Sequence, residues 1–433
     1  MELRNKVKKL FSTGFFHIFG GSIVNKVIVF LSSVVLIRIL DKSEYGIFTY
    51  AWNIYSVFLI FNGMGVDSGA LQIIAEKGNN QKHANEVINY STRIGLRFNI
   101  VICIAILVAG SLFHFPINGV SPILLSLCML PMVAFLSNMS LTYLRAQKRN
   151  QEYSYLSLIG ASATLIISSV LAFVFRSMGL VIGYYLSSII TVICGFALFH
   201  IKLLNNARYT VFDEKRALLK ISATSMLING LNQLMYYIDI FVIGLVDPQE
   251  TIIAAYRVAT IIPTAIAFIP SAIIMYIYPY FAEHKDDGAW CLRRYRQVLL
   301  SVAGLNAVIS GILFLGAPLI VKLFFGDRYI EIIAIFKLLA LNYFISGTFR
   351  TISGNLLVTQ RKLSYNFLVA VISSIVNVIA DYFLVMRWGS MGAAIATVLV
   401  TLITGTMATA YITLIYKKKA KQQRIQYSDG SKT

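Results

Sequence analysis

Long windows that are almost free of charge recur from one end of the chain to the other. An apolar stretch of about 20 residues is the length that an α-helix needs to cross the hydrocarbon core of a bilayer. Polarity does not alternate at every second residue, which argues against an outer-membrane β-barrel. We therefore predict an all-α integral membrane protein with about twelve spans, at residues 15–37, 45–66, 94–113, 122–143, 153–175, 179–201, 220–246, 252–280, 298–321, 331–357, 364–386 and 391–416.

The composition agrees with this class. The chain is 57% hydrophobic and 13% charged, whereas a soluble domain carries about 25% charged residues. The first apolar stretch is too long for a cleaved secretory signal and has no small-residue cleavage pattern, so it is predicted to be the first span. Three of the four cysteines lie in apolar spans and one in a basic loop, so we expect no disulfide framework and no metal site.

Lysine and arginine are distributed unevenly between the two sides of the predicted spans. With the N-terminus inside, 28 of the 38 lie in cytoplasmic segments, 6 on the opposite side and 4 within spans. The positive-inside rule then places both termini in the cytoplasm. This distribution also accounts for the net charge of +19 without nucleic acid, because each cation beside the membrane gains about 1 kcal/mol near anionic head groups.

The two halves of the chain repeat the same features in the same order. The segments "IRILDKSEYGIFTY" at 37–50 and "IGLVDPQETIIAAY" at 243–256 share five residues at an offset of 206. The segments "MGLVIGYYLSSIIT" at 178–191 and "MGAAIATVLVTLIT" at 391–404 share six residues at an offset of 213. Gln147 and Gln360, in the basic loops, match each other at the same offset. We interpret this as a duplication of six spans. Chance similarity between apolar helices is the alternative.

Six is an even number, so both halves enter from the cytoplasm as parallel repeats. We predict two pseudo-symmetric six-helix bundles around a central cleft whose access alternates as one bundle rocks against the other. The predicted parts are an N-terminal bundle at 1–204, a cytoplasmic linker at 205–219, a C-terminal bundle at 220–416 and a basic cytoplasmic tail at 417–433.

Polar side chains within spans are candidates for the lining of this cleft, because an ionisable group at mid-membrane costs about 3 kcal/mol and usually faces a partner or water. Span one carries Lys26. A spacing of four and three residues places a polar stripe on one face of span seven, comprising Ser225, Asn229, Asn232, Tyr236 and Asp239. Later spans add Arg257, Arg350 and Asp381. We predict substrate binding by Lys26, Asn229, Asn232, Tyr236, Arg257 and Arg350, and ion coupling by Asp239 or Asp381.

A structural role is the alternative for these charges. Asp239 with Arg257, or Asp381 with Arg350, would then form ion pairs that hold helices together. Arg257 and Asp239 are also candidates for snorkelling towards the head groups. The four cations within spans outnumber the two carboxylates, which favours an acidic or phosphate-bearing cargo.

Two segments are predicted to interrupt their spans. Pro263, Pro270 and Pro279 remove helix hydrogen bonds in span eight, and "NGMGVDSG" at 62–69 loosens the end of span two. Both are candidates for bending points or for fixed irregularities.

No catalytic motif accompanies these features. The chain has no GxxxxGK[ST] loop, no HExxH and no GxSxG. We therefore expect no enzyme activity and no cofactor.

The segments "VLIRILDKSEYGIFTYAWN", "RAQKRNQEYSYL" and "GNLLVTQRKLSYNF" give the chain a resemblance to the polysaccharide-transporter branch of the multidrug/oligosaccharidyl-lipid/polysaccharide (MOP) exporter superfamily, which includes O-antigen and capsule repeat-unit flippases. The resemblance covers nearly the whole chain. It implies a bacterial inner-membrane protein that flips undecaprenyl-pyrophosphate-linked oligosaccharide to the periplasmic leaflet, driven by an ion gradient or by downstream consumption. Membrane lipids and glycan polymerase or chain-length proteins are the implied partners. A cation-coupled drug exporter is the first alternative, and a membrane glycan polymerase or ligase is a more distant one.

Overall fold

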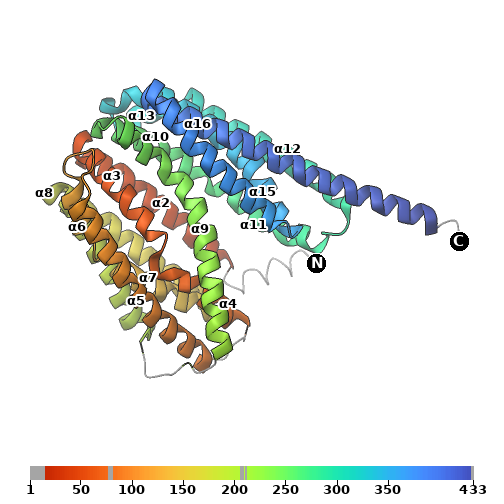
Figure 1. The fold of residues 1–433 in the computed structure, drawn as a ribbon, viewed down its shortest axis with the longest axis horizontal. Helices are drawn as coiled ribbons and strands as arrows, with labels where there is room; N and C mark the ends of the chain where they lie inside the picture. The colour runs from red at the N-terminus through yellow and green to blue at the C-terminus, as the bar shows by residue number, and fades with distance from the viewer. Residues whose placement is uncertain (1–14, 77–80, 205–208, 210–211, 431–433) are drawn as a thin grey trace. The chain divides into compact units, whose positions relative to one another are not determined.

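A computed structural model describes residues 15–76, 81–204, 209 and 212–430 (Figure 1). The described chain is helical almost throughout and contains no strand. It divides into two compact units, Met1–Tyr237 (unit 1) and Ile238–Thr433 (unit 2). The division lies within α9 (Phe212–Val246), whose first residues overlap the predicted linker at 205–219.

Unit 1 contains eight elements before α9. In chain order they are α2 (Phe15–Ile39), α3 (Lys42–Leu59), the 3₁₀ turn η1 (Asn62–Gly65), α4 (Val66–Glu76), α5 (Gln81–Leu112), α6 (Val120–Ser126), α7 (Leu130–Ala146) and α8 (Asn150–Phe199).

Unit 2 begins with the end of α9. The elements that follow are α10 (Glu250–Ile266), α11 (Phe268–Glu283), α12 (Gly288–Leu315), α13 (Ala317–Phe325), the 3₁₀ segment η2 (Asp327–Ile332), α14 (Ile333–Ile345), the π-helical turn η3 (Ser346–Arg350), α15 (Thr351–Thr359) and α16 (Leu363–Gly430).

The described helices come close to the predicted number of spans. Seven are long and apolar enough to cross a membrane, and nine if each of two bent helix pairs counts as one span. α8 and α16 contain two crossings each, because a break at Arg176 divides α8 and a break at Trp388 and Gly389 divides α16. Counted in this way the described helices supply eleven crossings, and α9 contributes only a shorter apolar helix, Tyr236–Val246.

The breaks in α8 and α16 show that the duplication extends to the backbone. Arg176 (φ 56°, ψ −135°) and Gly389 (φ 55°, ψ −141°) have nearly the same dihedral angles at the 213-residue offset (389 − 176). Three residues later, a Cβ on Gly179 or on Gly392 would lie 2.0 Å from the carbonyl oxygen eight positions earlier in the chain. Each unit therefore contains the same tight turn at the same repeat position.

Large apolar side chains cover the outside of both units. Phe173 is 75% exposed and Leu315 is 82% exposed, values that a bilayer tolerates because the acyl chains are as apolar as the side chains. The exposed apolar surface thus agrees with a multi-pass membrane protein.

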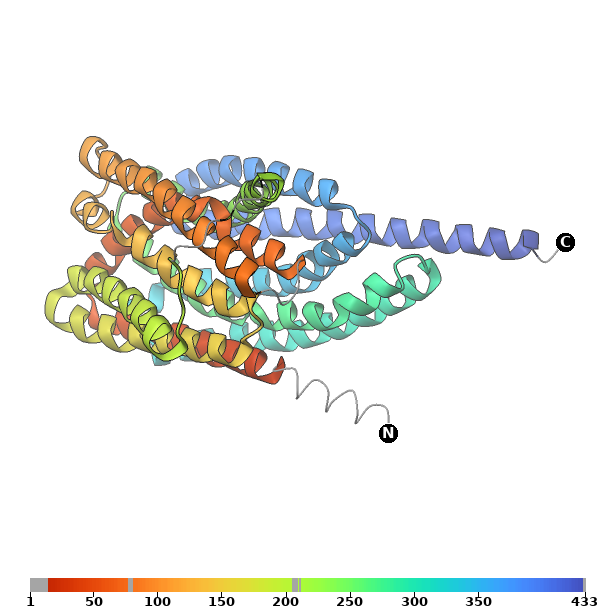
Figure 2. The same ribbon diagram turned by 90° about the horizontal axis from the view of Figure 1, so that it is seen from below.

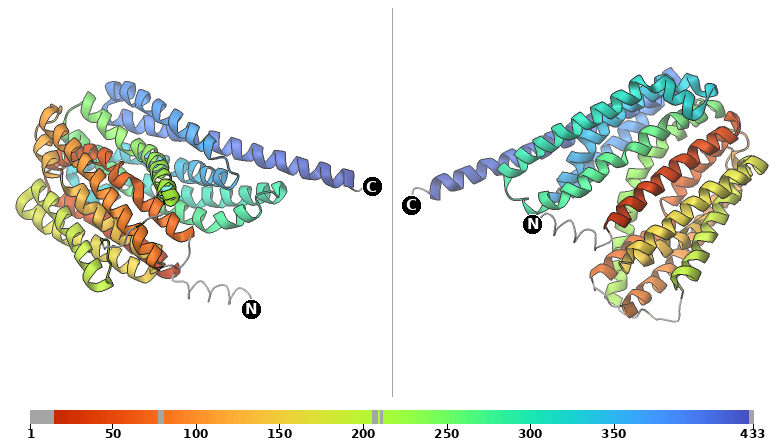
Figure 3. Two further views of the ribbon diagram at one scale, coloured as in Figure 1. Left: turned by 60° about the horizontal axis from the view of Figure 1, so that its bottom comes forward. Right: turned by 180° about the vertical axis from the view of Figure 1, so that it is seen from behind.

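The predicted basic tail is helical as far as Gly430 and continues α16 without interruption. In Figures 2 and 3 this part of the helix runs on well past the last turn of its neighbours in unit 2. Lys419 Nζ donates to the carbonyl oxygen of Lys285, 2.7 Å away, and lies 3.2 Å from Asp286 Oδ1. These contacts fix the start of the tail to the loop between α11 and α12.

The repeated turn predicts a matched pair of destabilising variants. Gly179→Ala and Gly392→Ala each place a methyl group against a backbone oxygen that cannot move aside, so each should lower the free energy of unfolding by about 2 kcal/mol. Gly311→Ala in α12 has open space around it and serves as the control. Thermal unfolding in detergent measures the effect, and equal stability of all three variants would contradict it.

Candidate functional site

Two carboxylates meet inside unit 2. Asp239 comes from α9 and is 7% exposed, and Asp381 comes from the first arm of α16 and is fully buried. The two carboxyl groups lie close enough together to interact electrostatically. Asn377, one helical turn before Asp381, faces the same way.

Hydroxyl and amide donors surround this pair. The Tyr256 hydroxyl donates to Asp239 Oδ2 at 2.5 Å, and Thr397 Oγ1 donates to the same oxygen at 2.8 Å. Asn377 Nδ2 donates to Asp381 Oδ2 at 2.8 Å. The Oδ1 atom of each carboxyl group accepts no hydrogen bond from any donor in the described chain.

This arrangement is suited to holding one positive charge. Two adjacent buried carboxylates repel each other and cannot both stay ionised unless a proton or a metal cation lies between them. The available ligands are oxygens, which suit a proton or a hard cation. The described residues contain no cluster of three or more His, Cys, Asp or Glu side chains that could hold a metal ion.

The ion pairs considered as the structural alternative are not formed among the described residues. In the described chain Asp239 bonds Tyr256 and Thr397 rather than Arg257, and Asp381 bonds Asn377 rather than Arg350. The reason is helical register: consecutive residues of α10 point about 100° apart, so Tyr256 faces the interior at 1% exposure while Arg257 is exposed.

Tyr256 and Thr397 were not predicted as members of the site. A signal existed for the tyrosine, because Tyr256 ends the second copy of the repeated segment and matches Tyr50 in the first. Thr397 gives no comparable signal, since a single threonine in an apolar span is common. Its role follows only from the packing of α16 against α9.

Lys26 borders a polar pocket in unit 1, between α2 and the first arm of α8. The pocket has a volume of about 200 Å³. Asn25 Nδ2 closes one side of it by donating to Ser157 Oγ at 2.8 Å and to the Ser157 carbonyl oxygen at 3.1 Å. The lysine is exposed. The residues that line the pocket are rich in hydrogen-bond donors, which suit an anion. They are Gly21, Ser22, Asn25, Lys26, Tyr153, Ser154 and Ser157.

The other predicted substrate-binding residues are distributed over both units. Asn229 and Tyr236 are exposed on α9 in unit 1, and the Asn232 side chain lies outside the described residues. In unit 2, Arg257 is exposed on α10 and Arg350 is half-buried at the end of η3. That these residues line one common cleft stays a prediction.

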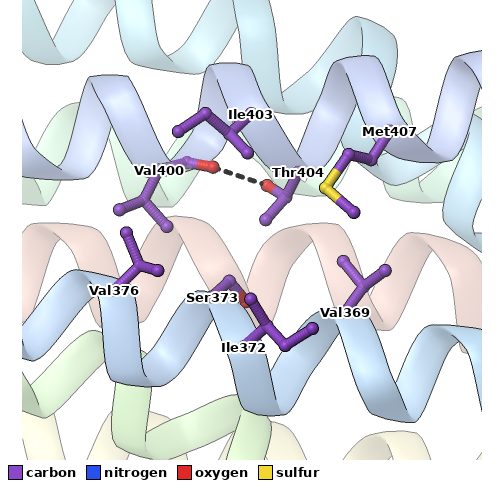
Figure 4. Close-up of a pocket in the computed structure, with 8 residues that line it drawn as sticks. All are labelled: Val369, Ile372, Ser373, Val376, Val400, Ile403, Thr404 and Met407. Atoms are coloured by element: carbon purple, nitrogen blue, oxygen red, sulfur yellow. Dashed lines mark hydrogen bonds between the residues drawn. The ribbon is translucent and has the colours of Figure 1, made fainter.

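A second pocket separates the two arms of α16 (Figure 4). Its volume is about 40 Å³, and only Ser373 and Thr404 among its lining residues are polar. Thr404 Oγ1 is occupied by a hydrogen bond to the Val400 carbonyl oxygen at 2.9 Å. This pocket offers no site for a charged or sugar group.

Known proteins resemble the chain in sequence and in fold. The profile of a family described as polysaccharide biosynthesis protein matches residues 35–334. No curated protein matches in sequence.

Solved structures share the fold at low sequence identity. A multidrug resistance MATE family transporter of the MOP superfamily, in an inward-facing conformation, gives a TM-score of 0.76 at 13% identity, with 92% of this chain and 96% of that chain covered. The lipid II flippase MurJ, in an inward closed conformation, gives 0.65 at 17% identity, with 94% and 90% covered. At identities this low, the structural similarity shows the fold alone. It confirms the predicted all-α, two-bundle architecture of a transporter fold.

The carboxylate pair predicts the effect of removing one hydroxyl. Tyr256→Phe takes a donor from Asp239 in a buried site, so it should lower the free energy of unfolding by about 1–3 kcal/mol. Tyr276→Phe, at a side chain that is 64% exposed, is the control. Thermal unfolding of both purified variants tests this, and the assignment fails if the two lose the same stability.

Proposed function

The chain belongs to the polysaccharide biosynthesis protein family, and on that premise we propose that it is a flippase for undecaprenyl-pyrophosphate-linked oligosaccharide. It carries repeat units of O-antigen, capsule or exopolysaccharide from the cytoplasmic to the periplasmic leaflet of the bacterial inner membrane by alternating access. The observation that carries the proposal is the family match over residues 35–334 on a MOP-superfamily transporter fold. A structural neighbour that is itself a lipid II flippase supports a lipid-linked cargo.

The polar pocket beside Lys26 supports an anionic cargo. A lysine gives a compact positive charge with three donors, and the neighbouring serine, asparagine and tyrosine side chains add neutral ones. A pyrophosphate or an acidic sugar satisfies both kinds of group. We assign further contacts with sugar hydroxyls to Asn229, Asn232 and Tyr236, and further contacts with negative charge to Arg257 and Arg350.

The carboxylate pair supports coupling to a cation gradient. Asp239 and Asp381 bind one proton or one alkali cation, and the bound and empty states differ by a full charge in a buried place. Such a charge difference biases two conformations of a carrier against each other. Glycan polymerase and chain-length proteins on the periplasmic side, which consume the product, are the proposed partners.

Drug export is the second candidate, because a MATE family transporter gives a TM-score of 0.76. A panel of cationic drugs separates the two functions. A strain lacking the protein should keep normal drug resistance and lose surface glycan if the flippase assignment is correct.

The cargo assignment predicts a charge-dependent loss of export. Deletion should cause lipid-linked repeat units to accumulate on the inner leaflet. Lys26→Ala should lower export by about tenfold at unchanged protein abundance, because one charged hydrogen bond is lost. Lys26→Arg keeps the positive charge and should retain most of the export activity. Lys421→Ala, at an exposed position in the tail, is the control. Normal export by Lys26→Ala would refute the role of the pocket.

The coupling assignment predicts cation-dependent stability. Adding Na⁺ in place of choline at constant ionic strength should raise the melting temperature of the purified protein if the site takes Na⁺. A steep pH dependence without a Na⁺ effect is expected if it takes a proton. Asp239→Asn and Asp381→Asn should remove either dependence, whereas Asp286→Asn, in an exposed loop, should leave it intact. Persistence of the dependence in both site variants would exclude the pair.

A further inference from the structure

We infer that Asn99 and Asn306 are positioning residues for transport, and that each fixes the bend of an interrupted span at a joint inside its own unit. The inference rests on the proposed carrier function, because a bend matters to transport only if the bundles move. It explains the breaks in the second and fourth spans of each unit, which neither the carboxylate pair nor the Lys26 pocket requires.

Span two of unit 1 is broken by three consecutive residues in the left-handed region. Gly63, Met64 and Gly65 have φ values of 56°, 55° and 69°. The axis of α3 is bent by 41° from that of the helix that follows the break. A non-glycine residue such as Met64 adopts this conformation only when its surroundings hold it there.

Asn99 of α5 supplies that support. It is fully buried, and its Oδ1 accepts from the Gly63 backbone N–H at 2.7 Å. Its Nδ2 donates to Asn62 Oδ1 at 2.7 Å and to the Pro131 carbonyl oxygen at 3.0 Å. Pro131 opens α7, whose axis is bent by 48° from that of α6. One side chain therefore holds both bent spans of unit 1.

An aromatic ring fills the remaining space at this joint. A Cβ on Gly63 would lie 2.3 Å from the Phe135 ring, and a Cβ on Gly95 would lie 2.1 Å from it. Only glycine at these two positions lets the ring of α7 pack between α5 and the break. The joint is thus closely packed as well as hydrogen-bonded.

Unit 2 has an asparagine at the equivalent place. Asn306 of α12 follows Asn99 by 207 residues (306 − 99), within the range of the repeat offsets, and is fully buried. Its Oδ1 accepts from the Tyr343 hydroxyl at 3.0 Å, and its Nδ2 donates to Thr348 Oγ1 at 3.1 Å. Thr348 lies in the π-helical turn η3, so the amide again holds an interrupted span.

The second joint also touches the interruption in span eight. A Cβ on Gly347 of η3 would lie 2.9 Å from Asn306 Nδ2 and 3.1 Å from Pro270 Cγ. Pro270 lies in the first turn of α11, just past the break between α10 and α11. In both units, the asparagine of the third span therefore lies where the second and fourth spans are irregular.

A purely structural role does not require this arrangement. An unbroken helix satisfies its own backbone in the bilayer and needs no buried amide, and broken helices occur at membrane depth chiefly beside cavities. Hinges are short segments that absorb large changes in φ and ψ. An amide both donates and accepts hydrogen bonds, so it can hold two parts of such a segment at one angle.

Distances within each unit test the inference. Spin labels at Lys42 and Gln72 report the angle between α3 and α4, and labels at Gln249 and Glu283 report the angle between α10 and α11. The measurements use pulsed electron spin resonance on the full chain, with its native cysteines replaced, in lipid nanodiscs. Asn99→Ala should broaden only the first distance distribution, and Asn306→Ala only the second.

Each variant should also slow translocation of lipid-linked oligosaccharide by about tenfold, the scale of one lost buried hydrogen bond, with little change in KM. Asn366→Ala is the control, because within the described part of the chain its side-chain amide has one hydrogen bond, to the Gly354 carbonyl oxygen at 2.8 Å. Phe135→Leu, which loosens the first joint while keeping the asparagine, should broaden the first distribution and covers the case in which Asn99→Ala does not fold.

Unchanged distributions in the folded variants, or equal broadening of both distances in each of them, would overturn the inference. Failure of the cargo assignment gives a different result. Translocation of the oligosaccharide is then absent already in the unmodified protein, while the distance distributions still respond to the asparagine variants.

Discussion

The hydrocarbon core of a bilayer offers no water, so a backbone group released by a break in a helix must find its partner within the protein. This constraint explains why each unit holds a buried asparagine beside an interrupted span. At the left-handed break, the side-chain oxygen of Asn99 accepts a hydrogen bond from the Gly63 backbone N–H, which an intact helix would have satisfied itself. In the π-helical turn, the side-chain amide of Asn306 donates to the Thr348 hydroxyl. In each unit a fully buried asparagine therefore lies where neighbouring spans are interrupted.

The same constraint separates the two kinds of charge. The cation near mid-span in unit 1, Lys26, borders a pocket of about 200 Å³ with hydroxyl and amide groups around it. The carboxylates of unit 2, by contrast, are enclosed with Tyr256, Thr397 and Asn377 as donors. A lysine placed beside these carboxylates would neutralise them and leave neither free for a ligand. Under the proposed function, their location in different units separates the place for an anionic cargo from the place for a coupling cation.

The spans, the duplication and the interruptions were predictable, because each depends on a local pattern of residues in the sequence. Hydropathy gave the spans, the repeated segments gave the duplication, and the proline and glycine runs marked the interruptions at 62–69 and near Pro270. The partners of Asp239 and Asp381 were not predictable from charge alone. Opposite charges suggested arginines, but helical register turns Tyr256 inward and Arg257 outward. The contact between Asn25 and Ser157 joins residues 132 positions apart, and no local pattern indicates it.

The repeat offsets show which parts of the duplicated design have diverged. Asp239 corresponds to Ser33 (239 − 206), Asp381 to Ser168 (381 − 213) and Thr397 to Tyr184 (397 − 213), so unit 1 has neutral hydroxyls where unit 2 holds its carboxylates. Lys26 in turn corresponds to Asn232 (26 + 206). The buried asparagines and the tight turns at Gly179 and Gly392 are nevertheless present in both units. The two halves thus keep the same joints but differ in charge. Under the proposed function, this difference lets one half bind the anionic cargo and the other bind the coupling cation.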